Sequence, residues 1–170
     1  MGESFQPRDQ LRAKQIQVTM AHVRTQIRNA VKTILTGLPT TGNRVFVSRV
    51  YPLEKADLPG IIIFTEQDET DNSQAAINNG SLILWSQLHT VVKAYAKGTA
   101  QVHNTLDQIA LEVRKVLLTN QNLGGLTENI NWQSTLIQIE IGAEQPVGTA
   151  EILFVIYYRI KENLLETPLT

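Results

Sequence analysis

A chain of 170 residues, of which 42% are hydrophobic, is long enough to bury the core of one ordinary domain. The sequence contains no cysteine, which excludes disulfide frameworks, thiolate nucleophiles and cysteine-ligated metal sites and favours a reducing compartment. Its net charge of −1 at pH 7 lacks the basic excess that is typical of dedicated nucleic-acid-binding proteins.

Neither a signal peptide nor a membrane span is expected. The first ten residues contain no apolar run of the kind that a signal peptide needs. The longest mostly apolar stretches, residues 58–64 and 152–158, are far shorter than the roughly 20 residues of a membrane span. We interpret both stretches as buried strands.

The first predicted element is a long amphipathic helix from Arg8 to Thr36. Between Ile16 and Ile34 the apolar residues recur in steps of three or four, which is the spacing of one helix face. Pro7 before this segment and Gly37 after it are residues that commonly mark helix ends.

Three segments with strand or loop character follow. Residues 44–50 and 60–65 are rich in β-formers, and two prolines lie in the connection between them, where they cannot donate to a sheet. Residues 66–80 are polar and rich in turn residues, which predicts an exposed, mobile loop. Residues 82–97 alternate with a period of two over much of their length and predict a long third strand.

The rest of the chain predicts a second helix and a closing hairpin. Apolar residues at helical spacing predict a helix over residues 102–116, with Thr99 as its N-cap and Asn120 near its end. Residues 132–141 and 151–160 predict the two strands of the hairpin. This order of elements predicts an α+β fold, a mainly antiparallel sheet of about five strands with both helices packed on one face.

No internal repeat or linker divides the chain into several domains. We expect residues 1–23 to form an N-terminal extension that continues into the first helix. Residues 24–163 are then a single α+β domain, and residues 164–170 are a C-terminal tail.

Charge is distributed unevenly along the chain. Residues 1–60 contain nine Lys or Arg and four Asp or Glu, whereas the remainder contains six and twelve. Basic residues recur every fourth position on the first helix, and carboxylates crowd the predicted loop after the second strand. A head-to-tail interface needs two different patches that match, and these two could provide them, although a solvated face is the alternative interpretation of either. The candidate interface residues are Arg24, Arg28, Lys32, Glu66, Asp68, Glu69 and Asp71.

Two segments partly match ligand-binding motifs. The segment 37–44 has the glycine separation of a phosphate loop, but it lacks the Lys-Ser/Thr pair and leads from a helix into a strand. In the acidic segment, Ser73 and Asn79 stand where an EF-hand loop needs glycine and glutamate, so only a looser Ca²⁺ or Mg²⁺ site remains open.

No catalytic constellation emerges either. His22, His89 and His103 lie on different predicted elements and form no zinc-type pair, and no GxSxG motif is present. We therefore predict neither an enzyme nor a bound cofactor. Trp85 and Lys93 share one side of the third strand with Tyr95 and come closest to a single-stranded nucleic-acid surface, but core packing or a subunit contact explains them more simply.

The succession of motifs resembles a known family. It consists of a leading helix (IRNAVKTIL), RVFVSRVYPL, DLPGIIIFTEQDE, LHTVVKAYAKG, LDQIALEVRKVL, and a final LIQIEIG followed by AEILFVIYYR. From about Arg24 to Arg159 this pattern resembles the tail terminator proteins of long-tailed bacteriophages. The most telling pieces are the Leu58-Pro59-Gly60 entry to an apolar strand and the closing Tyr-Tyr-Arg.

The resemblance implies an α+β structural protein of the virion tail or neck, assembled in the cytoplasm of a bacterial host, with no enzymatic activity. It implies a ring, typically of six copies, that caps the tail tube protein, stops tail polymerisation and joins the head-tail connector protein. DNA would pass through the central channel without sequence-specific binding. The N-terminal extension departs from the shorter members of the family.

Two alternatives stay open. The first is another phage neck or tail-completion subunit, because related small α+β folds recur at neighbouring positions. The second is a small-ligand-binding or enzymatic α+β domain, which should contain an apolar pocket with converging polar groups.

Overall fold

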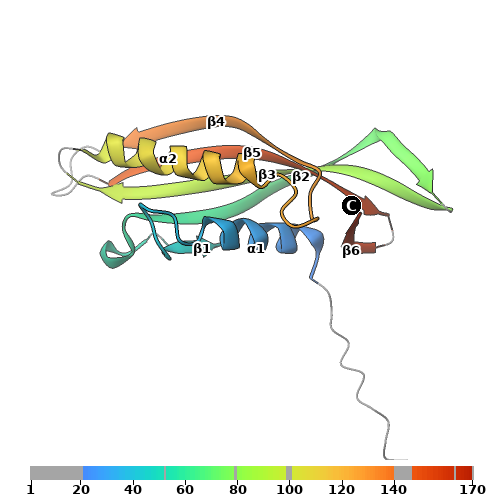
Figure 1. The fold of residues 1–170 in the computed structure, drawn as a ribbon, viewed down its shortest axis with the longest axis horizontal. Helices are drawn as coiled ribbons and strands as arrows, with labels where there is room; N and C mark the ends of the chain where they lie inside the picture. The colour runs from blue at the N-terminus through green and yellow to red at the C-terminus, as the bar shows by residue number, and fades with distance from the viewer. Residues whose placement is uncertain are drawn as a thin grey trace, which may run out of the picture.

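A computed structural model describes residues 21–51, 53–78, 80–98, 101–139, 147–162 and 164–169. In these ranges the elements in chain order are α1 (Val23–Leu35), β1 (Val45–Val47), the 3-10 helix η1 (Lys55–Asp57), β2 (Gly60–Asn78), β3 (Ser81–Lys97), α2 (Val102–Thr119), β4 (Asn129–Ile139), β5 (Val147–Lys161) and β6 (Leu164–Leu169) (Figure 1).

All the strands named above belong to one sheet with the order β1-β2-β3-β5-β4, and β6 pairs with β5. The short β1 runs parallel to β2, whereas every other pair is antiparallel. At residues 159–161, one edge of β5 pairs with β3 and the other edge pairs with β6. Further along β5, this second edge pairs with β4. The predicted α+β class and the mainly antiparallel sheet are confirmed.

Both helices pack on the same face of the sheet, as predicted (Figure 1). Helix α1 contacts β1 and β2, and α2 contacts β3, β5 and β4. Every second residue of β3 and β5 faces the helices, and the apolar side chains there are buried. The core side chains are Val23, Ile27, Val31 and Leu35 of α1, Leu106, Ile109, Val113 and Leu117 of α2, and Ile61, Ile63, Leu88, Val92, Ile152, Phe154 and Ile156 of the sheet.

Helix α2 lies directly on the sheet at Gly148 of β5. A Cβ atom added there would overlap Cγ1 of Val102 and lie 2.8 Å from Cδ1 of Leu106. Because glycine has no side chain, two apolar residues of the helix can rest directly on the strand.

The first helix begins later than predicted. His22 lies outside α1 and acts as its N-cap, because its Nδ1 accepts a hydrogen bond from the backbone N–H of Arg24 at 3.1 Å. A helix running without interruption from Arg8 to Thr36 is therefore wrong at its N-terminal side. Residues 1–20 lie outside the described residues.

The segment 66–80, predicted as an exposed mobile loop, is also different. Its described residues up to Asn78 belong to β2, which pairs with β3 back to Ser81. Backbone pairing does not require apolar side chains, and the outer part of this stretch, residues 71–78, has no helix over it that would penalise polar residues (Figure 1). The turn-rich composition instead accompanies two register shifts, between Thr65 and Asp68 and between Asp71 and Ala76.

The second half of the chain follows the prediction closely. The third strand, the second helix and the closing hairpin are confirmed as β3, α2 and the antiparallel pair β4–β5. The predicted cap Thr99 lies outside the described residues, and the N-cap of α2 is Gln101 without a side-chain hydrogen bond. Residues 164–169, assigned to the tail from the sequence, form β6.

Candidate functional site

The most prominent surface feature is an arm made by the outer ends of β2 and β3. We define the arm as residues 71–78 and 81–86, which project past the end of both helices (Figure 1). In its second register shift, four residues of β2 oppose one residue of β3, and the ribbon bends there. The arm is therefore a strand pair that the helix layer does not cover.

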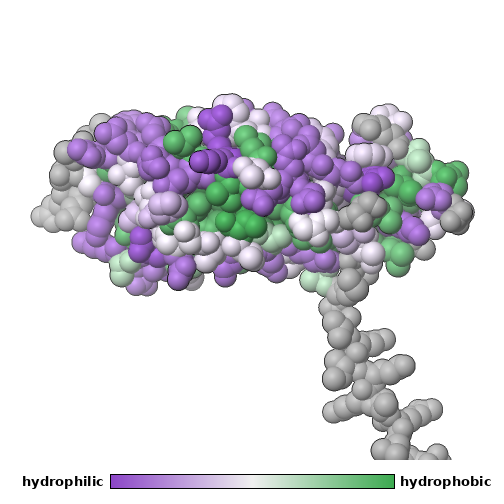
Figure 2. All heavy atoms as spheres, viewed as in Figure 1, coloured by the Kyte–Doolittle hydropathy of each residue, from purple (hydrophilic) through white to green (hydrophobic). Residues whose placement is uncertain are grey.

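The arm carries apolar residues and almost no charge. The sequence contains no Asp, Glu, Lys or Arg between Asn72 and Val92. Ile77 near the tip is 79% exposed, and Leu164 and Leu165 of β6, at the same end of the molecule, are exposed as well. Figure 2 shows apolar residues gathered at this projecting end. Exposed apolar surface of this kind marks places where proteins meet partners.

A polar cluster fastens α1 to the base of the arm. The hydroxyl of Tyr158 donates to both carboxylate oxygens of Asp68, at 2.9 and 2.8 Å, and Nε of Arg24 lies 3.5 Å from Oδ2 of Asp68. Burial, followed by the hydrogen bond to Asp68, raises the pKa of the Tyr158 phenol well above its ordinary value. One turn along α1, Nη1 of Arg28 donates to Oγ1 of Thr65 at 3.0 Å.

The seven interface residues predicted from charge thus fall into different environments. Arg24 and Asp68 join the two predicted patches within one chain, whereas Lys32, Glu66 and Glu69 are exposed. Asp71 begins the second register shift, where Oδ1 accepts a hydrogen bond from the backbone N–H of the residue two positions on, at 3.0 Å. A role of these residues at an interface stays a prediction.

Nothing in the described ranges groups three or more His, Asp or Glu side chains as ligands of a metal ion. The three histidines lie apart, since His22 caps α1, His89 lies on β3 and His103 lies on α2. Neither helix of the described chain combines the length and apolar character that would let it cross a membrane.

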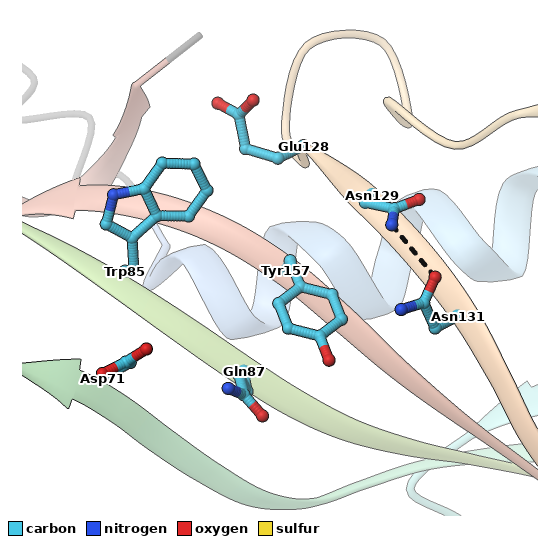
Figure 3. A pocket seen from close by; sticks show the side chains of 7 residues that line it. All are labelled: Asp71, Trp85, Gln87, Glu128, Asn129, Asn131 and Tyr157. Carbon is cyan, nitrogen blue, oxygen red and sulfur yellow. Dashed lines mark hydrogen bonds between the residues drawn. The ribbon is translucent and has the colours of Figure 1, made fainter. Parts of the chain in front are cut away.

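The face of the sheet opposite the helices contains a hollow of about 300 Å³. Figure 3 shows Trp85 of β3 and Tyr157 of β5 in its middle, with carboxylate and amide side chains around them. The lining residues are Asp71, Trp85, Gln87, Glu128, Asn129, Asn131 and Tyr157. Pairing between β3, β5 and β4 aligns them, because Tyr157 lies opposite both Gln87 and Asn129.

The side chain of Arg159 lies beside the hollow and contacts two of its lining residues. The guanidinium of Arg159 lies 5.1 Å from the centroid of the Trp85 ring, and its Nη2 and Nε contact Oε1 of Glu128 at 2.5 and 2.6 Å. At the back wall, Nδ2 of Asn129 donates to Oδ1 of Asn131 at 3.0 Å. The lining thus contains two carboxylates, Asp71 and Glu128, and Arg159 contacts the second of them.

Further along the same face, charges are balanced in pairs. Nζ of Lys93 lies 2.5 Å from Oε1 of Glu151, its cross-strand neighbour, and 5.8 Å from the centroid of the Tyr95 ring. The hydrogen bond to Glu151 raises the pKa of Lys93. Lys93 and Arg159, which each lie beside an aromatic ring of this face, thus both have a carboxylate partner.

The sequence predicted the side on which Trp85 lies, but it did not predict the hollow. Alternation placed Trp85 on the same side of the third strand as Lys93 and Tyr95, which the pairing confirms. Tyr157 and Asn129 come from other strands, and only the register of those strands brings them next to Trp85.

Comparison with known proteins gives little further information. No protein-family model matches the chain, and no curated protein matches it. Among solved structures, the chain is similar to one described as "Virion of native gene transfer agent (GTA) particle", with a TM-score of 0.42 and 13% sequence identity, over 84% of this chain and 93% of that chain.

Proposed function

We propose that the protein is a non-enzymatic structural subunit that associates head-to-tail into a ring and acts as a tail terminator in the tail or neck of a phage-like virion. The observation that carries this proposal is the arm, a strand pair with an exposed apolar tip and no charged residue beyond Asp71 at its base. Beyond Ile83, where the pairing of β3 with β5 ends, the tip of the arm has two strands only. Two-stranded hairpins are marginally stable in water by themselves, so a partner surface would stabilise this tip. The resemblance of the sequence pattern to tail terminators supports the same role.

The edges of the sheet also favour head-to-tail contacts. β1 pairs with β2 only at Ile61–Ile63, so within the described residues the outer edge of β2 has no strand partner from Phe64 to Asn78. At the opposite side of the sheet, β4 is an edge strand over Asn129–Ile139. Open edges offer unpaired backbone groups to another chain. Two unlike edges suit a heterologous contact, which closes into a ring if the rotation between neighbours permits it.

The remaining parts of the proposal come from the family resemblance. The ring would contain about six copies, a number typical of that family and consistent with closed point-group assembly. One side would cap the tail tube protein and stop its polymerisation, and the other would meet the head-tail connector protein. DNA would cross the channel without sequence-specific contacts.

The test measures the mass of the purified protein by light scattering at several ionic strengths, with imaging of any oligomer. We expect a ring for the natural sequence. Ile77→Lys, which places a charge at the arm tip, should shift the population toward monomers without lowering the unfolding temperature, because Ile77 makes few contacts in the monomer.

Leu111→Lys is the matched control, since Leu111 is 59% exposed on α2, away from the arm. This variant should assemble as the natural sequence does. A protein that stays monomeric at every ionic strength, or an Ile77→Lys variant that forms intact rings, would contradict the proposal.

A further inference from the structure

We infer that the hollow on the face of the sheet opposite the helices binds one pyranose unit of a carbohydrate. This inference goes beyond the proposed function and does not depend on it, because a subunit can bind a sugar whether or not it assembles into a ring. It assigns a ligand class to the hollow, which the proposed ring contacts do not require.

The charged groups of the hollow already have partners within the protein. Oδ1 of Asp71 accepts hydrogen bonds from the backbone N–H and the hydroxyl of Ser73, at 3.0 and 2.5 Å. Oε1 of Glu128 is contacted by two nitrogens of Arg159. Among the described residues that line the hollow, none is a Lys, Arg or His that could hold an anion. This lining therefore favours a guest without net charge.

Two aromatic side chains provide a stacking surface for such a guest. Tyr157 lies opposite Gln87, two residues along β3 from Trp85, so the two aromatic residues occupy diagonal positions on neighbouring strands. Side chains at diagonal positions are roughly 7 Å apart, so a guest the size of one sugar ring can touch both (Figure 3). The face of an aromatic ring is electron-rich, whereas the C–H groups on one face of a pyranose carry partial positive charge, so the two stack favourably.

Neutral hydrogen-bonding groups surround the two rings. Within the part of the chain that the structure describes, the side-chain amide of Gln87 and the hydroxyl of Tyr157 make no hydrogen bond. Asn131 accepts from Asn129 through Oδ1, so its amide nitrogen remains a donor for a guest (Figure 3). Carboxamides both donate and accept, as sugar hydroxyls do, so the two match. A run of prolines also stacks on aromatic rings, but it has acceptors only and would leave the carbonyl oxygen of Gln87 without a donor.

The size of the hollow limits the guest to one sugar unit. Its volume of about 300 Å³ is at the lower end of the range for ligand pockets, roughly 300–1,000 Å³. The hollow is open to one side, so a sugar at the end of a chain can enter while the rest of the chain stays outside. A free sugar and the terminal unit of a glycan therefore share the chemistry that the hollow recognises.

The test follows the fluorescence of Trp85 during titration with the methyl glycosides of glucose, galactose and N-acetylglucosamine, and with cellotetraose and chitotetraose. The sequence has two tryptophans, and Trp132→Phe leaves Trp85 as the only one. Trp132 lies on the helix side of the sheet, where the guanidinium of Arg114 is 3.8 Å from its ring centroid, so its replacement spares the hollow. If Trp132→Phe does not fold, saturation-transfer NMR on the sugars with the natural sequence measures the same binding.

We expect saturable binding of at least one methyl glycoside, with a half-point on the order of 1–10 mM, as befits a guest of one ring. Gln87→Ala should weaken this binding roughly three- to tenfold, the loss expected for one or two neutral hydrogen bonds. Gln138→Ala is the matched control, because Gln138 is exposed at the other end of β4 from the hollow, and it should leave binding unchanged. Raising the salt concentration from about 0.05 to about 0.5 M should change the half-point by less than about twofold, because the guest is neutral.

Tighter binding of a tetrasaccharide than of its methyl glycoside would identify a glycan end as the source of the sugar, and equal binding would identify a free sugar; either result supports the inference. No response to any of these sugars, equal binding by Gln87→Ala and the natural sequence, or tighter binding of a blocked tetraproline or Gly-Arg-Gly peptide than of every sugar would overturn it. Rings that bind no sugar would leave the proposed function standing, whereas a permanent monomer that binds a sugar would leave only this inference standing.

Discussion

The hydrogen bonds between Tyr158 and Asp68 make a quantitative prediction about what holds the base of the arm to the rest of the domain. Tyr158 is buried, and its hydroxyl donates to the carboxylate that also faces Arg24. Tyr158→Phe removes this donor and keeps the ring that fills the core. Asp68 is then left with Arg24 and with water.

The expected loss follows from the exposure of the carboxylate. A hydrogen bond to a charged group contributes about 1.5–3 kcal/mol to stability. The Asp68 side chain is 20% exposed, so water recovers part of that contribution. We therefore expect a loss of about 1–2 kcal/mol, which corresponds to a fall of about 2–8 °C in the unfolding temperature of a domain of this size.

Urea unfolding and calorimetry measure this loss, and the chain offers its own control. Tyr157 is the next residue along β5, but its side chain lies on the opposite face in the hollow. Tyr157→Phe should therefore change stability by less than about 0.5 kcal/mol. In an Asp68→Ala background, Tyr158→Phe should cost much less than in the natural sequence, because the two residues are coupled. Equal costs for the two tyrosines, or in the two backgrounds, would refute the reasoning.

Two further predictions concern pH and packing. The folded protein holds the pKa of Tyr158 above the ordinary 10.0, so the contribution of this phenol to stability is fully present below pH 10 and declines above it, by up to about 1.4 kcal/mol per pH unit. Unfolding scans at alkaline pH should therefore show a shallower loss of stability for Tyr158→Phe than for the natural sequence. Identical slopes for the two proteins would count against the raised pKa. Gly148→Ala should destabilise the domain by about 1–3 kcal/mol, because the new methyl overlaps Val102; Val102→Ala should relieve part of that cost in the double variant, and a Gly148→Ala protein as stable as the natural sequence would contradict the tight contact.

The elements that sequence reasoning predicted well are those that pack against the helices or form them. β3 alternates because one side of it is buried along most of its length, and α2 carries an apolar stripe because it rests on three strands. The arm lacks such a buried side, so its composition predicted a loop. For α1 the helical spacing of apolar residues continues upstream of His22, so the sequence predicted an earlier start. The helix begins after His22 because the imidazole caps it, and the spacing of apolar residues does not reveal such a cap.

The sequence did not predict the hollow, and the reason is a different one. Its residues come from several strands, and which of them share a face depends on the strand order and on irregularities in pairing. One such irregularity lies in β4 between Trp132 and Ser134 and reverses the alternation of that strand. A single sequence contains the period of each strand but not the register between strands.

The first register shift of β2 determines on which side of the sheet Asp68 and Asp71 lie. Between Thr65 and Asp68, two residues of β2 oppose one of β3, so odd-numbered residues face the helices before this point and even-numbered residues face them from here to the second register shift. That one additional residue turns Asp68 toward Tyr158 and sends Asp71 to the other side of the sheet. Without this shift, regular alternation of the same sequence would place Asp68 on the side of the hollow and Asp71 on the side of the helices, so one irregularity in pairing fixes both the contact between Asp68 and Tyr158 and the carboxylate that Asp71 contributes to the hollow.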